Sequence, residues 1–263
     1  MASRGIPAGL VALLCWLAAC SSGGAGGRSV GQRFADGGAC PPSRSSELPA
    51  GSGCVTEVRA DLDGDARPDR FAVYARLSHG TPVSWWARAV LGDSSRPTPA
   101  VRLPAATSVG GTAAIYPRVA GAADANGLPG SEVFVQLTAD LYHGAAPPID
   151  AIYDVREGRL VPVTSGGKLF TFPTAGISRF GDGARCTSDR VFTLTHVQIE
   201  PHGWTWTDHR YVWNGTQLAP VGGGGTGNLP VLNISDPRVS RHYELMCGDL
   251  RISQVTDSYP PPP

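Results

Sequence analysis

Four aspartates in one short stretch have the spacing expected of ligands for a hard cation. They occupy its first, third, fifth and ninth positions, with a glycine at the fourth: Asp61, Asp63, Asp65 and Asp69. Ca²⁺ takes about six to eight oxygen ligands, and carboxylates at alternate positions of a tight turn can converge on one ion. The main-chain carbonyl of Arg67, at the seventh position, could supply another oxygen. The sequence therefore predicts a Ca²⁺ site in this loop.

Other interpretations of the same stretch are open. An EF-hand is excluded, because Ala72 stands at the twelfth position, where that motif has glutamate, and the β-type run 70–77 follows in place of a helix. Asp and Gly also favour tight turns without any metal, so the loop could be a simple hairpin connection. A catalytic metal would instead need an open coordination position facing a pocket.

The acidic stretch recurs along the chain in weaker form. Residues 124–132 place Asp124, Asn126 and Glu132 at ligand positions, but Leu128 stands at the fifth. With fewer side-chain oxygens, this second site should bind Ca²⁺ more weakly. In the third stretch, 181–189, the first, third and fifth positions are Gly181, Gly183 and Arg185. This third loop is expected to have lost its metal.

Strand-like segments flank each acidic stretch. Alternating or apolar runs precede and follow the loops, and the dipeptides Glu157-Gly158 and Asn214-Gly215 between such runs are typical of tight hairpins. Each unit is therefore predicted as strand, acidic loop, strand, longer link, strand, tight turn and strand, which is the plan of a propeller blade. The predicted fold class is all-β and propeller-like, with about three four-stranded blade-like repeats, closed or open, and no substantial helix after the leader.

The loops and their strands resemble the FG-GAP/VCBS repeat family over about residues 54–222. The resemblance is specific at the first loop, partial at the second and poor at the third. It implies calcium-loop repeats on a propeller. The implied ligands are Asp61, Asp63, Asp65, the Arg67 carbonyl and Asp69, then Asp124, Asn126 and Glu132. A closed propeller usually needs about four or more blades, so the C-terminal residues 229–255 could add strands, or the assembly could be open.

The first residues have the features of an export signal. Arg4 supplies a positive charge, and the apolar segment Gly9–Ala19 is too short to span a bilayer as a helix. The segment ends in Leu-Ala-Ala-Cys20, which resembles the lipobox of bacterial lipoproteins. That resemblance implies that residues 1–19 are a signal peptide and that Cys20 becomes the lipid-modified N-terminus. Its acyl chains would anchor the protein at the extracytoplasmic face of the cell membrane. The alternative is an ordinary signal peptide with an incidental cysteine.

Composition divides the remaining chain. Residues 20–52, rich in Gly, Ser, Pro and Ala, are predicted to be a flexible lipid-anchored tether. Residues 53–257 are the predicted β-repeat domain, and the proline-rich end, 258–263, is a predicted disordered tail. The 263-residue chain has a formal net charge of zero and no long basic run. This argues against nucleic acid as its partner.

Disulfides are expected because an exported chain folds where they persist. Of the six cysteines, Cys15 lies in the leader and Cys20 is the lipidation site, which leaves Cys40, Cys54, Cys186 and Cys247. Four cysteines allow three pairings, and the sequence does not choose among them. The preferred pairing is Cys40–Cys54 with Cys186–Cys247, each contributing roughly 3–4 kcal/mol in the chain-entropy model. No CxxC pair supports zinc or thioredoxin-like chemistry.

Two functions follow from these patterns. The first is a membrane-anchored extracytoplasmic lipoprotein, whose calcium-binding β-repeat domain acts as a binding or scaffold module for a protein or glycan ligand. The alternative is a secreted metal-assisted hydrolase on a propeller-like fold. No nucleophile elbow, Walker loop or HExxH spacing occurs, which favours the first. Four tryptophans could stack on a sugar if exposed, or form core if buried: Trp85, Trp86, Trp204 and Trp206.

Overall fold

The all-β prediction is confirmed. The computed structural model describes residues 27–28, 30–31, 40–92, 97–109, 117–138, 148–176, 180–187, 189–230 and 236–252. Within these ranges the only helices are two four-residue segments, η1 (Ala106–Val109) and α1 (Pro237–Ser240). Neither has the length or the apolar character needed to cross a membrane. The predicted signal peptide 1–19, Cys20 and the tail 258–263 lie outside the described residues.

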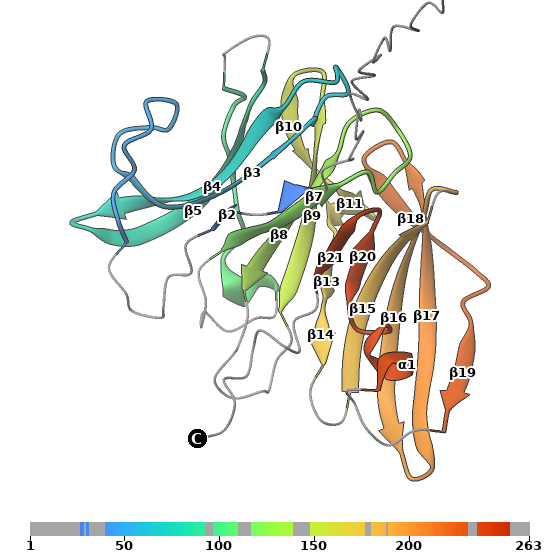
Figure 1. The fold of residues 1–263 in the computed structure, drawn as a ribbon. Coiled ribbons are helices and arrows are strands. Elements are labelled where there is room, and N and C mark those ends of the chain that lie inside the picture. Colours follow the sequence, from blue (N-terminus) through green and yellow to red (C-terminus); the bar gives the residue numbers. More distant parts are fainter. Residues whose placement is uncertain are drawn as a thin grey trace, which may run out of the picture.

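Three sheets make up the fold, and two of them begin with short strands near the N-terminus (Figure 1). The first sheet has the order β2 (Val30–Gly31), β3 (Ser52–Ala60), β4 (Asp69–Ser78), β5 (Thr81–Val90) and β6 (Val101–Arg102). The second has the order β1 (Gly27–Arg28), β7 (Arg118–Ala123), β8 (Glu132–Thr138), β9 (Ile149–Arg156) and β10 (Arg159–Pro162), with β13 (Thr171–Pro173) also on β9.

The third sheet is the largest. Its main path has the order β12 (Lys168–Leu169), β11 (Thr164–Ser165), β18 (Gln217–Val221), β17 (Gly203–Asn214), β16 (Val191–Glu200), β15 (Phe180–Thr187), β20 (Leu245–Cys247) and β21 (Leu250–Ile252). β14 (Ala175–Gly176) pairs with β15, and β19 (Thr226–Leu229) pairs with β17. In the described part of the chain the three sheets contain five, six and ten strands, and each stays open. The predicted four-stranded plan is not reproduced: in the first unit, for example, a tight turn at His79 and Gly80 joins β4 to β5 where the sequence predicts a longer link.

The tight turns lie where the sequence predicts them. Glu157 and Gly158 join β9 to β10 with positive φ angles of 52° and 69°, and Gly215, at 61°, joins β17 to β18. At Glu157-Gly158, positive φ at both central residues matches the right-handed twist of the paired strands, whereas in the β17–β18 turn only the first central residue, Gly215, has positive φ.

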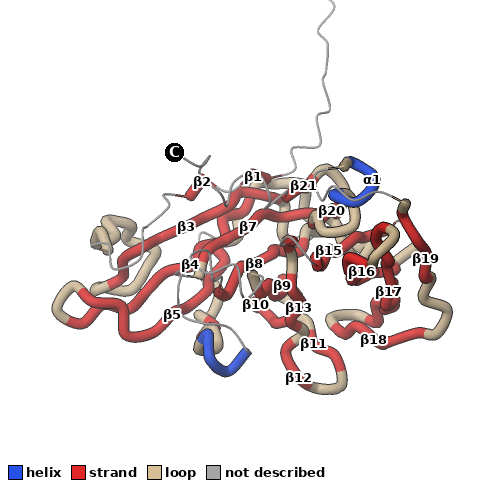
Figure 2. Tube along the Cα trace, turned by 90° about the horizontal axis from the view of Figure 1, so that it is seen from below, coloured by secondary structure: helices blue, strands red, loops and turns tan. Residues whose placement is uncertain are grey.

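The second sheet lies between the other two and packs against both, as the view from below also shows (Figure 2). All seven residues of β8 are buried. Val133 and Val135 belong to the core shared with the first sheet, which contains Phe71 and Val73. Phe134, which lies between them in the strand, points to the opposite face and belongs to the core shared with the third sheet. Because successive strand residues point to opposite faces, one strand serves two cores.

The prediction of a third acidic loop is wrong, because residues 181–187 belong to strand β15 and the chain reverses only at Asp189–Arg190. Its two glycines are needed for close packing and not for a turn. A Cβ atom on Gly183 would lie 2.2 Å from the carbonyl oxygen of His242, and one on Gly181 would lie 2.9 Å from the Cβ of Tyr243. Glycine therefore lets the C-terminal segment lie directly on β15.

The preferred disulfide pairing is present. Cys40 is bonded to Cys54, with Cα atoms 4.9 Å apart, and Cys186 to Cys247, with Cα atoms 4.6 Å apart. Residues just before β3 also pack on the domain: Leu48 is buried beside Tyr74. The packed part of the chain therefore begins no later than Cys40, inside the segment that the sequence assigns to the tether.

We predict that Gly183→Ala destabilises the domain. The added methyl group would meet main-chain atoms of His242 and Tyr243, so β15 or the C-terminal segment must shift. Such overpacking should lower the free energy of unfolding by about 1–3 kcal/mol. Gly222→Ala is the matched control, since its Cβ would meet no heavy atom within 4 Å, and should change stability by less than about 0.5 kcal/mol. Urea denaturation measures both, and equal stabilities would contradict the packing argument.

Candidate functional site

The first acidic loop, between β3 and β4, is curled by its own carboxylates. Asp61 accepts hydrogen bonds from the N–H groups of Gly64 (2.7 Å) and Ala66 (2.9 Å). Asp63 accepts from the N–H of Asp65 (3.3 Å), and Asp65 accepts from the N–H of Arg67 (2.8 Å). These local bonds are typical of Asp-rich turns, and they hold alternate carboxylates on the inside of the loop.

Three of the predicted ligands lie together. Carboxylate oxygens of Asp61, Asp63 and Asp65 lie within 4.8 Å of one another, and the last two side chains are exposed. The pKa of Asp63 is raised, first by partial burial and then by the neighbouring negative charges. The cluster holds like charges close together, so a bound cation would relieve the repulsion and find several oxygens in reach.

Asp69 has a different position from the other three. It is buried, and each of its oxygens accepts a main-chain hydrogen bond: one from Leu62 (2.8 Å) and one from Gly92 (2.7 Å). This carboxylate ties the start of the acidic loop to the start of β4 and to the end of β5. Its visible role is to hold the loop in place, whereas a role as a metal ligand stays a prediction.

The second loop repeats the hydrogen bonding of the first. Asp124 accepts from Gly127 (2.7 Å), and the side-chain oxygen of Asn126 accepts from the N–H of Leu128 (2.7 Å). Glu132, at the start of β8, takes the place of Asp69 and accepts from the N–H groups of Ala125 (2.7 Å) and Asn126 (3.2 Å). The sequence repeat is thus a structural repeat at the level of individual hydrogen bonds.

The side chains of the second loop are less available to a cation. The amide group of Asn126 donates to Glu132, and both side chains are completely buried. Burial raises the pKa of Glu132 to about 8, against a smaller opposite effect of the hydrogen bond from the N–H of Ala125. Of the predicted second set, only Asp124 is exposed. The arrangement agrees with a weaker second site, which stays a prediction.

The first acidic loop, which joins β3 to β4 in the first sheet, contacts the second, which joins β7 to β8 in the second sheet. The N–H of Ser131 donates to the carbonyl oxygen of Asp61 (2.8 Å). A Cβ on Gly64 would lie 2.6 Å from the Cβ of Pro129, and one on Gly130 would lie 2.6 Å from the carbonyl oxygen of Leu62. The conformation of the first loop is therefore coupled to the position of the second.

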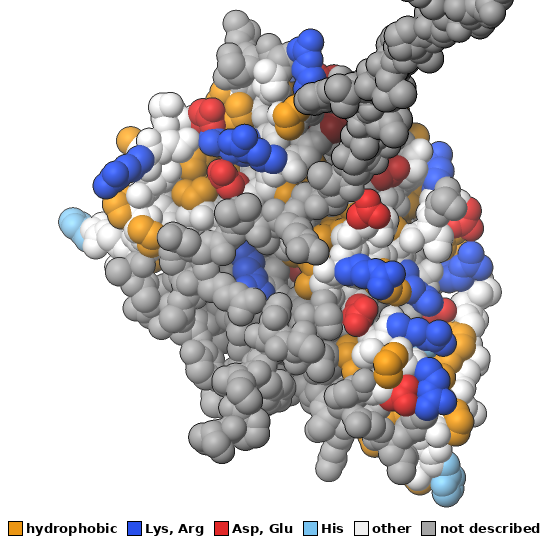
Figure 3. Space-filling model, in the orientation of Figure 1, with side chains coloured by type: hydrophobic (Ala, Val, Ile, Leu, Met, Phe, Trp, Pro, Cys, Tyr) orange, Lys and Arg blue, Asp and Glu red, His pale blue; other side chains and the backbone are white. Residues whose placement is uncertain are grey.

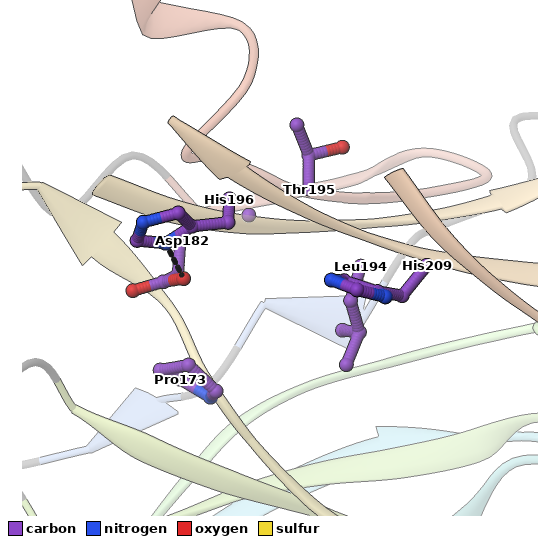
Figure 4. Close-up of a pocket in the computed structure, with 7 residues that line it drawn as sticks. Pro173, Asp182, Leu194, Thr195, His196 and His209 are labelled. Carbon is purple, nitrogen blue, oxygen red and sulfur yellow. Dashed lines mark hydrogen bonds and ion pairs between the residues drawn. The ribbon is translucent and has the colours of Figure 1, made fainter. Parts of the chain in front are cut away.

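A pocket on the third sheet was missed by sequence reasoning. It measures about 290 Å³ and contains a hydrogen-bonded pair in which Nδ1 of His196 lies 2.8 Å from a carboxylate oxygen of Asp182 (Figure 4). Burial raises the pKa of Asp182, and His196 partly offsets the shift. The two residues face each other because β15 and β16 pair in that register, which a search for sequence motifs does not detect.

The tryptophans offer little free aromatic surface. Trp204 is buried, and Trp85 and Trp86 pack against buried clusters. Trp206 is stacked on His242, with ring centroids 5.6 Å apart, and Gly227 packs on its indole ring. Their main contribution is to packing, so a sugar platform built on Trp206 is not favoured.

The chain matches no protein-family model, no curated protein and no solved structure. The acidic loops and the pocket that contains His196 are the features of the described chain that bear on its function.

We predict that Asp69→Asn destabilises the apo protein more than Asp65→Asn does. An amide at position 69 has one oxygen and cannot accept from both Leu62 and Gly92, so a buried N–H loses its partner. The expected loss in the free energy of unfolding is about 1–3 kcal/mol. Asp65 is exposed and its amide analogue can still accept from Arg67, so the control should lose less than about 0.5 kcal/mol.

Chemical denaturation in EGTA measures both variants. If Asp69→Asn is as stable as wild type, Asp69 does not hold the loop as described.

Proposed function

We propose that this chain is a membrane-anchored extracytoplasmic lipoprotein, whose β domain binds Ca²⁺ and acts as a binding or scaffold module. The leader and the Leu-Ala-Ala-Cys20 motif support the export and the lipid anchor at Cys20. The two disulfides fit an oxidising compartment outside the cytoplasm.

The acidic cluster in the first loop is the observation that carries the calcium proposal. Three carboxylates within 4.8 Å supply several hard oxygen ligands and as much as three negative charges. Two of the side chains are exposed, so an ion can reach them and keep water molecules in its coordination sphere. Ca²⁺ suits such a site better than Mg²⁺, because Mg²⁺ demands stricter geometry and loses its water reluctantly.

The ion would stabilise more than its own loop. Asp61 contributes to the cluster through its side chain and accepts from Ser131 of the second loop through its carbonyl oxygen. Fixing Asp61 would therefore hold the contact between the first and second sheets. Binding free energy adds to folding free energy wherever the site is absent from the unfolded chain.

The repeat architecture supports a scaffold role. We interpret the three sheets as blade-like units of an open, propeller-like assembly related in plan to FG-GAP/VCBS repeats. In support, the first and second units share an acidic loop with the same hydrogen bonds.

The geometry favours binding over metal-assisted hydrolysis. A catalytic metal needs an open coordination position beside a substrate pocket. The acidic cluster lies on a loop of the first sheet. Its members, Asp61, Asp63 and Asp65, do not line either hollow described on the third sheet.

Calcium should raise the melting temperature of the wild-type protein, and Asp63→Ala should abolish the rise. At a free Ca²⁺ concentration about 100 times Kd, the gain in stability is about 2.7 kcal/mol. For a domain of this size that is a rise of roughly 5–10 °C. Thermal melts in EGTA and in excess Ca²⁺ measure the difference.

Asp124→Ala is the matched control for this experiment. It removes an exposed aspartate from the second loop and should keep most of the calcium-dependent rise. No rise in the wild type at millimolar Ca²⁺, or an equal rise in Asp63→Ala, would contradict the proposed site.

A further inference from the structure

One end of the third sheet carries polar side chains on the face opposite α1. Asp182 and His196 lie on this face of β15 and β16, and His209 lies on β17, beside Leu194 (Figure 4). The other face is covered: Gly181 and Gly183 pack on the C-terminal segment, and Trp204 and Val197 form a core with α1. The polar residues therefore lie on the face of β15, β16 and β17 that is opposite the packed C-terminal segment.

Two adjoining hollows share His196. The first, of about 290 Å³, has apolar walls from Pro173 and Leu194 beside the Asp182–His196 pair and His209. The second, of about 530 Å³, is lined by Phe180, His196, Gln198 and Ile199. The volumes are in the range of small-molecule sites, which combine apolar walls with a few placed polar groups.

The histidine is oriented by its carboxylate partner. Asp182 accepts a hydrogen bond from Nδ1 of His196 at 2.8 Å, which leaves Nε2 as an acceptor in the neutral imidazole. Nε2 has no hydrogen-bond partner in the described part of the chain, and 44% of the His196 side chain is exposed. Gln198 and His209 are exposed nearby and can both donate and accept.

The charges around the hollows favour an uncharged ligand. Among the described residues, no Lys or Arg lines either hollow. Arg185, on the same strand as Asp182, points to the other face and forms an ion pair with Asp208 at 3.0 Å. Asp182, the one acidic group among the described lining residues, is already bonded to His196. Among these described residues an anion would find no fixed positive partner, and a cation would compete with the histidine for Asp182.

Covalent catalysis has no nucleophile here. Within the described lining there is no serine or cysteine, and its one hydroxyl side chain, that of Thr195, bonds to Asp208 on the opposite face. A carboxylate-oriented histidine without a nucleophile is suited to recognition of hydroxyl groups.

We propose that the two adjoining hollows around His196 together bind a neutral saccharide. Sugar hydroxyls both donate and accept, as do the amide and imidazole groups of the site, and Asp182 can accept a further bond. Leu194, Pro173 and Phe180 offer apolar surface to the C–H faces of a sugar ring. The inference rests on the proposed function as a binding module, since it names the ligand class, but it requires neither Ca²⁺ nor the anchor.

Histidine side-chain NMR of the full chain tests the proposal. D-glucose, D-mannose, N-acetyl-D-glucosamine and trehalose are titrated separately to about 50 mM, which detects Kd values in the millimolar range. At least one should shift the imidazole signals of His196, while those of His242, which is stacked on Trp206 on the opposite face, stay unchanged. His196→Ala should weaken binding about tenfold, by loss of one hydrogen bond to the ligand.

Gln198→Ala is a second pocket variant, for the case in which His196→Ala does not fold. The Gln198 side chain is exposed, so this variant should fold and should also weaken sugar binding. Asp63→Ala separates the two proposals: it should remove the calcium response and leave sugar binding intact. The saccharide site is overturned if no sugar shifts His196, if His242 shifts equally, or if both pocket variants bind as wild type. A failed calcium response with intact sugar binding overturns only the calcium loop.

On the face drawn in Figure 3, basic and acidic side chains intermingle over the third sheet. Among the described side chains drawn there, no patch of a single charge stands out as a site for a charged polymer.

Discussion

A buried carboxylate at the first residue of a strand holds each acidic loop of this protein. Asp69 and Glu132 both accept the N–H of the residue that follows the loop's first acid, seven positions earlier in the chain. A buried carboxylate is costly unless its oxygens are hydrogen-bonded, so the loop must close around it. In the first loop, closure around Asp69 leaves the carboxylates of Asp61, Asp63 and Asp65 close to one another.

The position of the loops also determines how the sheets meet. Because the first loop contacts the second through Asp61 and Ser131, the first two sheets are joined at their loop ends as well as through their shared core. The middle sheet then packs on the third through its other face, where Phe134 meets the aromatic cluster around Phe192. A cation at the first loop would act at one end of this stack, whereas the histidine hollow lies on the third sheet.

Local patterns in the sequence predicted much of this arrangement. Alternating apolar residues predict the strands, Glu157-Gly158 and Asn214-Gly215 predict the hairpins, and the spacing of the acids predicts both loops that form. The failures come from long-range contacts. Gly181 and Gly183 indicate a turn, but they are required by the approach of residues 242–243. Asp182 meets His196 only through strand register, which no local motif encodes.

Amide hydrogen exchange in Ca²⁺ and in EGTA tests the central claim most directly, because it localises the effect of the ion. If Ca²⁺ binds the first loop and holds the first two sheets together, exchange should slow at Gly64, Ala66 and Arg67, and at Ser131 across the contact. Amides of β16 and β17, remote from the loop, should not change. Unchanged exchange at all four loop amides in saturating Ca²⁺ would contradict the account.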